Sequence, residues 1–171
     1  MDKEILFTRE EIQKRIIELG QEISGDYKHS DLVAIGVLSG AFIFMADLIR
    51  ALTISVQVDF VRMASYGSKT EPDGELRFTK DIEIPLGKKH VLIVEDIVDT
   101  GATLMYLEEA IKLHSPLSIK VCALINKTER RRNAVEIDYA GFAVDSGFVV
   151  GYGLDYNERY RHFSDLYRLR A

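Results

Sequence analysis

The sequence predicts an α/β protein in which a parallel twisted sheet is flanked by helices, with a small C-terminal/N-terminal hood or flap. Three apolar runs, at 32–38, 91–94 and 121–125, are typical of strands buried on both faces. Helical patterns precede and follow these runs, and the strand–helix–strand order favours parallel strands with helices on both sides of the sheet.

Composition limits the class of protein. With 171 residues, 47% apolar and 29% charged, the chain has a globular balance and suits a single domain over residues 1–171. A net charge of −5 gives no general attraction to nucleic acid or to an anionic membrane. One cysteine, Cys122, excludes an intramolecular disulfide and lies in an apolar run, as a core thiol would. The N-terminus has no signal-peptide core and the apolar runs are far shorter than a membrane span, so we expect a cytoplasmic protein.

The first half of the chain contains two predicted helices and two predicted strands. Thr8 and Glu11 form a capping box, and the apolar face that follows predicts a helix up to Gly25. A strand at 32–38, a helix at about 41–52 and a strand at 54–63 come next. Residues 64–74 are polar and rich in turn formers, which predicts a mobile surface loop, followed by a short strand near 76–79.

The second half contains the clearest strand–helix–strand unit. A strand at 91–94 leads through a loop at 95–101 into a helix that ends before Pro116, and a strand at 119–125 follows. From Glu136 onward the pattern is less regular. A turn at 145–147, a short strand at 148–150 and an aromatic, glycine-rich stretch at 151–156 predict a flap packed beside the sheet.

Residues 95–103 concentrate the polar chemistry of the chain. Three acids, two threonines and one glycine follow a buried strand, where ligands of open parallel sheets bind. Thr100, Gly101 and Thr103 open a helix whose free N–H groups attract an anion. Glu95 and Asp96 are costly at a buried strand end unless hydroxyls or a cation compensate them. An ordinary helix cap with solvated acids is the plainer alternative, and the density of polar groups favours a site for a 5′-phosphate and a ribose.

Residues 91–104, VLIVEDIVDTGATL, resemble the phosphoribosyl diphosphate motif of the type I phosphoribosyltransferase family. Ser65-Tyr66, Asn126-Lys127-Thr128 and the stretch 148–156 are similar to the hypoxanthine-guanine branch of that family. The resemblance runs in order over nearly the whole chain. It implies a purine salvage enzyme that makes IMP or GMP from hypoxanthine or guanine and phosphoribosyl diphosphate.

The resemblance also implies residue roles. Asp99 would accept and donate the proton at the purine N7. Glu95 and Asp96 would face the ribose hydroxyls and a bound Mg²⁺, and Asp155 would bind a second Mg²⁺. The 5′-phosphate would be held by Thr100, Gly101, Ala102 and Thr103; the base by Lys127 at its 6-oxo group, Phe148, Val149 and Asp155; the diphosphate by Ser39, Gly40 and Arg161; and Ser65 and Tyr66 would form the base of the flexible loop.

Two positions depart from the family pattern. Ser39 stands where the family usually carries Lys or Arg, so a positive side chain is missing beside the diphosphate. The turn Asp145-Ser146-Gly147 differs from the usual Pro-Asp-Lys-like turn before Phe148, which leaves the preference at the base edge open.

Alternatives remain at this point. A regulator with the same fold that binds RNA or DNA would need a broad basic face, and the chain offers only Glu129-Arg130-Arg131-Arg132, which we interpret as a solvated edge or a subunit contact. A phosphoribosyltransferase for xanthine or another base is a third hypothesis. The resemblance implies small-molecule partners and a homodimer or homotetramer, without choosing between the two.

Overall fold

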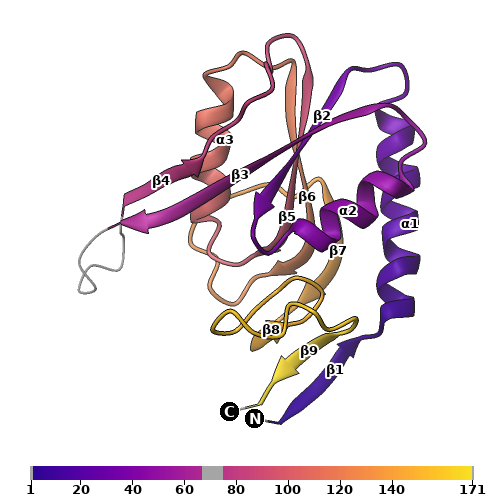
Figure 1. Ribbon diagram of the computed structural model, residues 1–171, viewed down its shortest axis with the longest axis vertical. Coiled ribbons are helices and arrows are strands. Elements are labelled where there is room, and N and C mark those ends of the chain that lie inside the picture. Colours follow the sequence, from indigo (N-terminus) through magenta and orange to yellow (C-terminus); the bar gives the residue numbers. More distant parts are fainter. Residues whose placement is uncertain (1, 67–74, 171) are drawn as a thin grey trace.

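The computed structural model describes residues 2–66 and 75–170. Within these ranges a six-stranded sheet has the order β4-β3-β2-β5-β6-β7, and a separate three-stranded sheet has the order β1-β9-β8 (Figure 1). The elements, in chain order, are β1 Lys3–Phe7, α1 Arg9–Asp26, β2 Leu32–Leu38, α2 Phe42–Ala51, β3 Val56–Tyr66, β4 Glu75–Lys80, β5 His90–Val98, α3 Ala102–Lys112, β6 Ser118–Lys127, β7 Tyr139–Val144, β8 Phe148–Val150 and β9 Leu166–Leu169.

The large sheet confirms the predicted α/β architecture. Strands β3, β2, β5, β6 and β7 run parallel, and only β4 is antiparallel to its neighbour, β3. Helices α1 and α2 cover one face and α3 covers the other (Figure 1). Side chains of β2 alternate between the two apolar cores, with Ala34 on the α1/α2 side and Val33 and Ile35 on the α3 side. Cys122 is fully buried in β6, as predicted.

Helix α1 begins where its capping box predicts. The Thr8 hydroxyl accepts a hydrogen bond from Glu11 N at 3.3 Å, and Glu11 Oε2 accepts one from Thr8 N at 2.8 Å. The predicted apolar face is buried against the sheet. None of the described helices is both long enough and apolar enough to cross a membrane.

The small sheet, which we call the hood, joins the two ends of the chain. Strands β1 and β9 pair antiparallel, and β8 pairs with β9 on its other side, so the two termini lie side by side (Figure 1). Of the three hood strands, the sequence predicts only β8. Both β1 and β9 are short and partly polar, and each depends on a partner at the far end of the chain, so local pattern carries little signal for them. The parallel edge strand β7, also missed, falls in the stretch described above as irregular.

Two strands extend beyond their predicted ends. Strand β5 continues through Glu95 and Asp96 to Val98 because β6 supplies its hydrogen-bond partners, so these acids belong to a strand and not to a loop. Strand β3 continues to Tyr66, so Ser65 and Tyr66, expected in a loop, pair with β4. The remainder of the expected loop, 67–74, lies outside the described residues.

A buried carboxylate on β3 fixes the segment that follows β4. Asp59 is 7% exposed and accepts hydrogen bonds from four groups: the backbone N–H groups of Phe60, Glu83 and Ile84, at 2.7, 2.7 and 3.0 Å, and Lys80 Nζ at 3.1 Å. Burial alone would raise the pKa of Asp59, but these donors together hold it below its ordinary value. The ionised form is therefore the one that stabilises the fold.

Asp59→Asn should lower the free energy of unfolding at pH 7 by about 2 kcal/mol, because an amide N–H₂ would meet backbone donors in place of an acceptor. The contribution is complete above the unfolded pKa of about 3.9 and is lost as pH falls through the lower folded value, so the gap between the two proteins should narrow below about pH 4. Urea unfolding at pH 7 and at acid pH measures both effects. Glu109→Gln, in an exposed pair with Lys112, is the control, with an expected change of under about 0.5 kcal/mol. A pH-independent gap would contradict this role for Asp59.

Candidate active site

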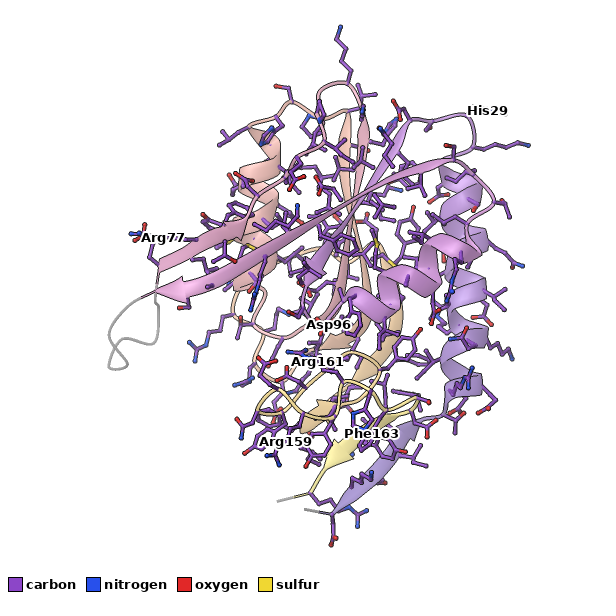
Figure 2. All side chains as sticks on the ribbon, viewed as in Figure 1. His29, Arg77, Asp96, Arg159, Arg161 and Phe163 are labelled. Carbon is purple, nitrogen blue, oxygen red and sulfur yellow. The ribbon has the colours of Figure 1, made fainter. Side chains whose placement is uncertain are left out.

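Two adjoining cavities lie at the carboxyl ends of the parallel strands, the first beside β3 and β4 and the second beside the hood strand β8. Their volumes are about 320 and 200 Å³, and Asp96, Ile97 and Asp99 line both. Figure 2 shows Asp96 at the strand ends, with Arg161 below it on the hood side. The first cavity also contacts Gly40, Glu95 and the start of α3, whereas the second contacts Lys127, Phe148 and Asp155. Chain topology thus brings most of the predicted site residues to one edge of the sheet.

The start of α3 forms the anion-binding end of the first cavity. Gly101 is the N-cap and has φ +84°, a conformation that glycine adopts without strain. The Thr100 hydroxyl accepts a hydrogen bond from Ala102 N at 3.3 Å, and Thr103 lines the cavity. The N–H groups of a first helical turn have no partner within the helix, so this end of the cavity favours a phosphate.

Two neighbouring acids, the buried Glu95 and the half-buried Asp96, lie near the end of β5. Burial raises the pKa of Glu95 well above its ordinary value, and the neighbouring Asp96 charge raises it further. Burial also raises the pKa of Asp96, although hydrogen bonds from Glu95 and from the Ile97 backbone oppose the shift. Such a pair is poorly compensated by the described protein groups alone, so it is suited to ligand hydroxyls or a cation.

The loop after β2 presses closely on Asp96. A Cβ added at Gly40 would lie 1.8 Å from Asp96 Oδ2, and one added at Gly153 would lie 2.4 Å from Gly40 O. Glycine at position 40 thus brings the backbone against the Asp96 carboxyl group, and glycine at position 153 brings the stretch between β8 and β9 against the Gly40 carbonyl. The Leu38–Ser39 peptide bond in this loop is cis, and Ser39 itself is exposed.

Arg161 connects the glycine-rich stretch to Asp155. Its Nη1 donates to Gly153 O at 2.8 Å, and its Nη2 lies 3.1 Å from Asp155 Oδ1 and 2.9 Å from Glu158 Oε2. Asp155 Oδ2 accepts a hydrogen bond from Glu158 N at 2.8 Å. The guanidinium is thereby held near the loop at Ser39 and Gly40, where the diphosphate is expected.

The second cavity brings together Lys127 and Asp99, the two side chains predicted to contact the polar atoms of the base and called here the base-reading groups. Lys127 is 5% exposed, and its Nζ lies 3.7 Å from Asp99 Oδ2. Phe148 is 56% exposed at the cavity, with its ring edge-on to Tyr156, and Val149 is buried behind it. An ammonium donor, a carboxylate and an open aromatic face suit a flat heterocycle that has both acceptor and donor atoms.

Residues 129–132, interpreted above as a solvated edge or a subunit contact, also contribute contacts to the site. Arg130 remains mostly exposed but binds Asp99 Oδ2 through Nε at 3.0 Å and also through Nη2, and Arg131 donates to backbone carbonyls at the ends of both β5 and β6. Glu129 Oε2 lies 3.3 Å from Lys127 Nζ and accepts from Gly147 N at 3.3 Å. These three contributors were missed because a charge run usually marks a solvated surface. Their position within four residues of Lys127, a predicted base-binding residue, could have indicated that they lie close to the site.

Several predicted residues stand at the margin of the cavities. Ser65 is exposed near the end of β3, and the hydrophobic side chains of Met63 and Leu76 line the first cavity from this hairpin instead. Ser39, Ala102 and Arg161 flank the cavities rather than line them. The geometry therefore supports the predicted phosphate, ribose and base groups most directly.

The donor set fits magnesium if the substrate supplies further ligands. No group of three or more His, Cys, Asp or Glu side chains gathers as a metal cage within residues 2–66 and 75–170. Magnesium is commonly held by one or two carboxylates together with waters and substrate phosphates. Glu95 and Asp96 provide such carboxylates, whereas Asp155 already shares its charge with Arg161.

Comparisons with known proteins agree with this geometry. A family model described as a phosphoribosyl transferase domain matches residues 3–157. The hypoxanthine-guanine phosphoribosyltransferase of Bacillus subtilis is 43% identical over 160 residues, covering 94% of this chain and 89% of the relative. The hypoxanthine phosphoribosyltransferase of Escherichia coli is 44% identical over 161 residues, covering 93% and 90%. A crystal structure of the Staphylococcus aureus hypoxanthine phosphoribosyltransferase superposes with a TM-score of 0.93 at 38% identity, covering 98% of this chain and 91% of that one.

Gly40→Ala should weaken the binding of inorganic diphosphate with Mg²⁺ at least about tenfold, because the new methyl group must displace the Asp96 carboxylate or the loop itself. Isothermal titration calorimetry measures the change. Gly25→Ala is the matched control, since a Cβ there meets nothing within 4 Å and affinity should stay at the wild-type level. Wild-type affinity in Gly40→Ala would show that the close approach to Asp96 is not needed.

Proposed function

The chain belongs to the phosphoribosyltransferase family, in its hypoxanthine-guanine branch, and we propose from this premise how its residues carry out the transfer. The protein is a purine salvage enzyme. Its reaction joins hypoxanthine or guanine to 5-phosphoribosyl 1-diphosphate, giving IMP or GMP and diphosphate. The bond from the ribose C1 to the diphosphate oxygen breaks, and a bond from C1 to the purine N9 forms.

The first cavity would hold the phosphoribosyl group. The 5′-phosphate would lie against the N–H groups at the start of α3, with the hydroxyls of Thr100 and Thr103 as further donors. The ribose hydroxyls would face Glu95 and Asp96. Burial raises the pKa of both, so a bound cation would stabilise their ionised form, and that negative charge would tolerate the positive character that develops on the ribose ring.

The diphosphate would leave toward the loop at Ser39 and Gly40. Backbone N–H groups of this loop and the Arg161 guanidinium would neutralise the charge that develops on it. Bound Mg²⁺ would supply additional charge neutralisation there, with Glu95, Asp96 and Asp155 as the protein carboxylates nearest to it. Because Ser39 carries no charge, the cationic contribution of the protein rests on Arg161.

The second cavity would hold the purine. Lys127 would donate to the 6-oxo group, Phe148 would stack on the ring, and Val149 and Asp155 would lie along the other edge of the base. Asp99 would take up the N7 proton as the base becomes a nucleophile at N9, and could return it in the reverse reaction. Since Arg130 occupies Asp99 Oδ2 in this structure, base binding at that oxygen requires the guanidinium to move or to share it.

The observation that carries the assignment is the pairing of two cavities that share Asp96 and Asp99. One has a helix N-terminus for a phosphate, and the other places Lys127 and Asp99 3.7 Å apart for a purine. A ligand that spans both would have its ribose between them, where bond exchange occurs. The acidic net charge and the bonds that Arg130 and Arg131 make to Asp99 give no support to a regulator that binds RNA or DNA.

Further expectations belong to the same proposal. Residues 1–171 would act as one phosphoribosyltransferase domain, which the match over 3–157 supports. The enzyme would work in the cytoplasm, with small-molecule substrates, as a homodimer or homotetramer.

Nucleotide formation from phosphoribosyl diphosphate and Mg²⁺ tests the function, with hypoxanthine, guanine, xanthine and adenine compared side by side. Hypoxanthine and guanine should react, and adenine should have a kcat/KM at least about 10³-fold lower, because its 6-amino group would meet the Lys127 ammonium donor to donor. Chromatographic measurement of the nucleotide product gives the ranking. Turnover of xanthine alone would support the third hypothesis of the sequence analysis, and binding of phosphoribosyl diphosphate without any turnover would support the regulator.

Asp99→Asn should lower kcat with hypoxanthine by about 10²-fold, the usual scale of lost acid–base catalysis, while the KM values change little. Steady-state kinetics with both substrates separates the two effects. Asp31→Asn is a matched control, because Asp31 is exposed ahead of β2, at the opposite end of the strands from the site. A wild-type kcat in Asp99→Asn would remove Asp99 from proton transfer.

A further inference from the structure

Arg131 joins the ends of two neighbouring strands behind the second cavity. Strands β5 and β6 pair in parallel as far as Val98 and Asn126, and beyond that point they no longer pair with each other, although β6 still pairs with β7 at Lys127. Arg131 provides donors there. Its guanidinium binds four acceptors: Asp99 O at 2.8 Å and Val98 O at 3.0 Å at the end of β5, and Asn126 Oδ1 at 2.7 Å and Lys127 O at 3.1 Å at the end of β6.

The four acceptors belong to the residues that carry the base-reading groups or to their immediate neighbours. Asp99 and Lys127 lie on different strands, and the separation of their side chains depends on how the two strand ends are held. The backbone that follows Arg131 adds to this connection, because Arg132 N and Asn133 N both donate to Thr100 O, at 3.0 and 3.1 Å. The contacts therefore connect Lys127 and Asp99 to Thr100, just before the start of α3.

The chemistry of arginine suits this task. A planar guanidinium offers several donors in a fixed fork, so one side chain can bridge acceptors on two chain segments, whereas a lysine ammonium acts as a single point. Arg130 plays a different part, since it binds the Asp99 carboxylate from the exposed side. Arg132 is exposed, and its backbone N–H, rather than its side chain, contacts the loop.

We propose that Arg131 is a positioning residue for purine recognition: it fixes the relative placement of Asp99 and Lys127, so that one purine can engage both through N7 and the 6-oxo group. This inference rests on the roles proposed above for those two side chains. The phosphoribosyl site, built from the start of α3 and from Glu95 and Asp96, depends much less on the guanidinium. Loss of Arg131 should consequently affect the base far more than phosphoribosyl diphosphate.

The test is steady-state kinetics of the full chain with Arg131→Lys, using hypoxanthine, guanine and adenine, with Arg132→Lys as the matched control. Misplacement by about 1 Å costs on the order of 10²-fold, so kcat/KM for hypoxanthine should fall by about that factor. The KM for phosphoribosyl diphosphate should stay within about threefold, and discrimination against adenine should fall at least about tenfold, because a displaced Lys127 rejects the 6-amino group less strictly. Arg132→Lys should retain wild-type values.

Asn126→Ala is a second variant, which removes one acceptor while keeping the guanidinium. It should lower kcat/KM for hypoxanthine at least about threefold without changing the KM for phosphoribosyl diphosphate, and it decides the matter if Arg131→Lys does not fold. A wild-type kcat/KM in Arg131→Lys, or in Asn126→Ala if Arg131→Lys does not fold, would overturn the proposal. An equal rise of the KM for hypoxanthine and the KM for phosphoribosyl diphosphate would also overturn it.

Asp99→Asn and Lys127→Ala are measured in parallel, to separate a failure of the positioning role from a failure of the proposed function. If both lower base turnover while Arg131→Lys does not, only the positioning role fails; if neither does, the roles of Asp99 and Lys127 fail and the inference fails with them.

Discussion

Two carboxyl groups at the end of the central strand β5 set the main constraint on this protein. Strand pairing places the buried Glu95 and the half-buried Asp96 at this end, and burial raises the pKa of each. Each carboxyl group accepts a hydrogen bond from the backbone N–H of the residue that follows it. The surroundings are consistent with a ligand completing them: Gly40 brings backbone against Asp96, Gly153 brings the hood against Gly40, and α3 begins a few residues beyond with its donors exposed. The fold in this way holds a charged strand end open for a hydroxylated, phosphorylated molecule.

The hood follows from the same constraint. The glycine-rich stretch between β8 and β9 can approach the strand ends only if it is itself anchored, and pairing of β9 with both β8 and β1 provides that anchor. The N-terminal strand therefore contributes to the site without contacting it. Arg161 then links this stretch to Asp155, which brings a cation to the side of the cavity where Ser39 supplies none.

Residues that satisfy local rules were predictable, and those that depend on distant partners were not. The capping box at Thr8, the two-faced burial of β2 and the glycine at the N-cap of α3 each follow from a physical requirement visible in a few neighbouring residues. In contrast, β1 exists because β9 pairs with it, and the last residues of β3 remain extended because β4 does. Arg130 and Arg131 have the composition of a solvated surface, and only the return of the chain toward Asp99 turns them into parts of the site.

The turn at 145–147, which departs from the family pattern, is linked to Lys127 through Glu129. Gly147 has φ +95° and donates its N–H to Glu129 Oε2, and the same carboxylate oxygen lies 3.3 Å from Lys127 Nζ. Glu129 therefore connects the turn before Phe148 to the Lys127 ammonium, which is proposed to bind the 6-oxo group of the purine. Lys127 is held between Glu129 on one side and Asp99 on the other, and its own strand end is held by Arg131. A charge run that seemed separate from the site in the sequence thus contacts both Lys127 and Asp99, the two side chains proposed to bind the purine, and this is the geometry on which the proposed positioning role of Arg131 rests.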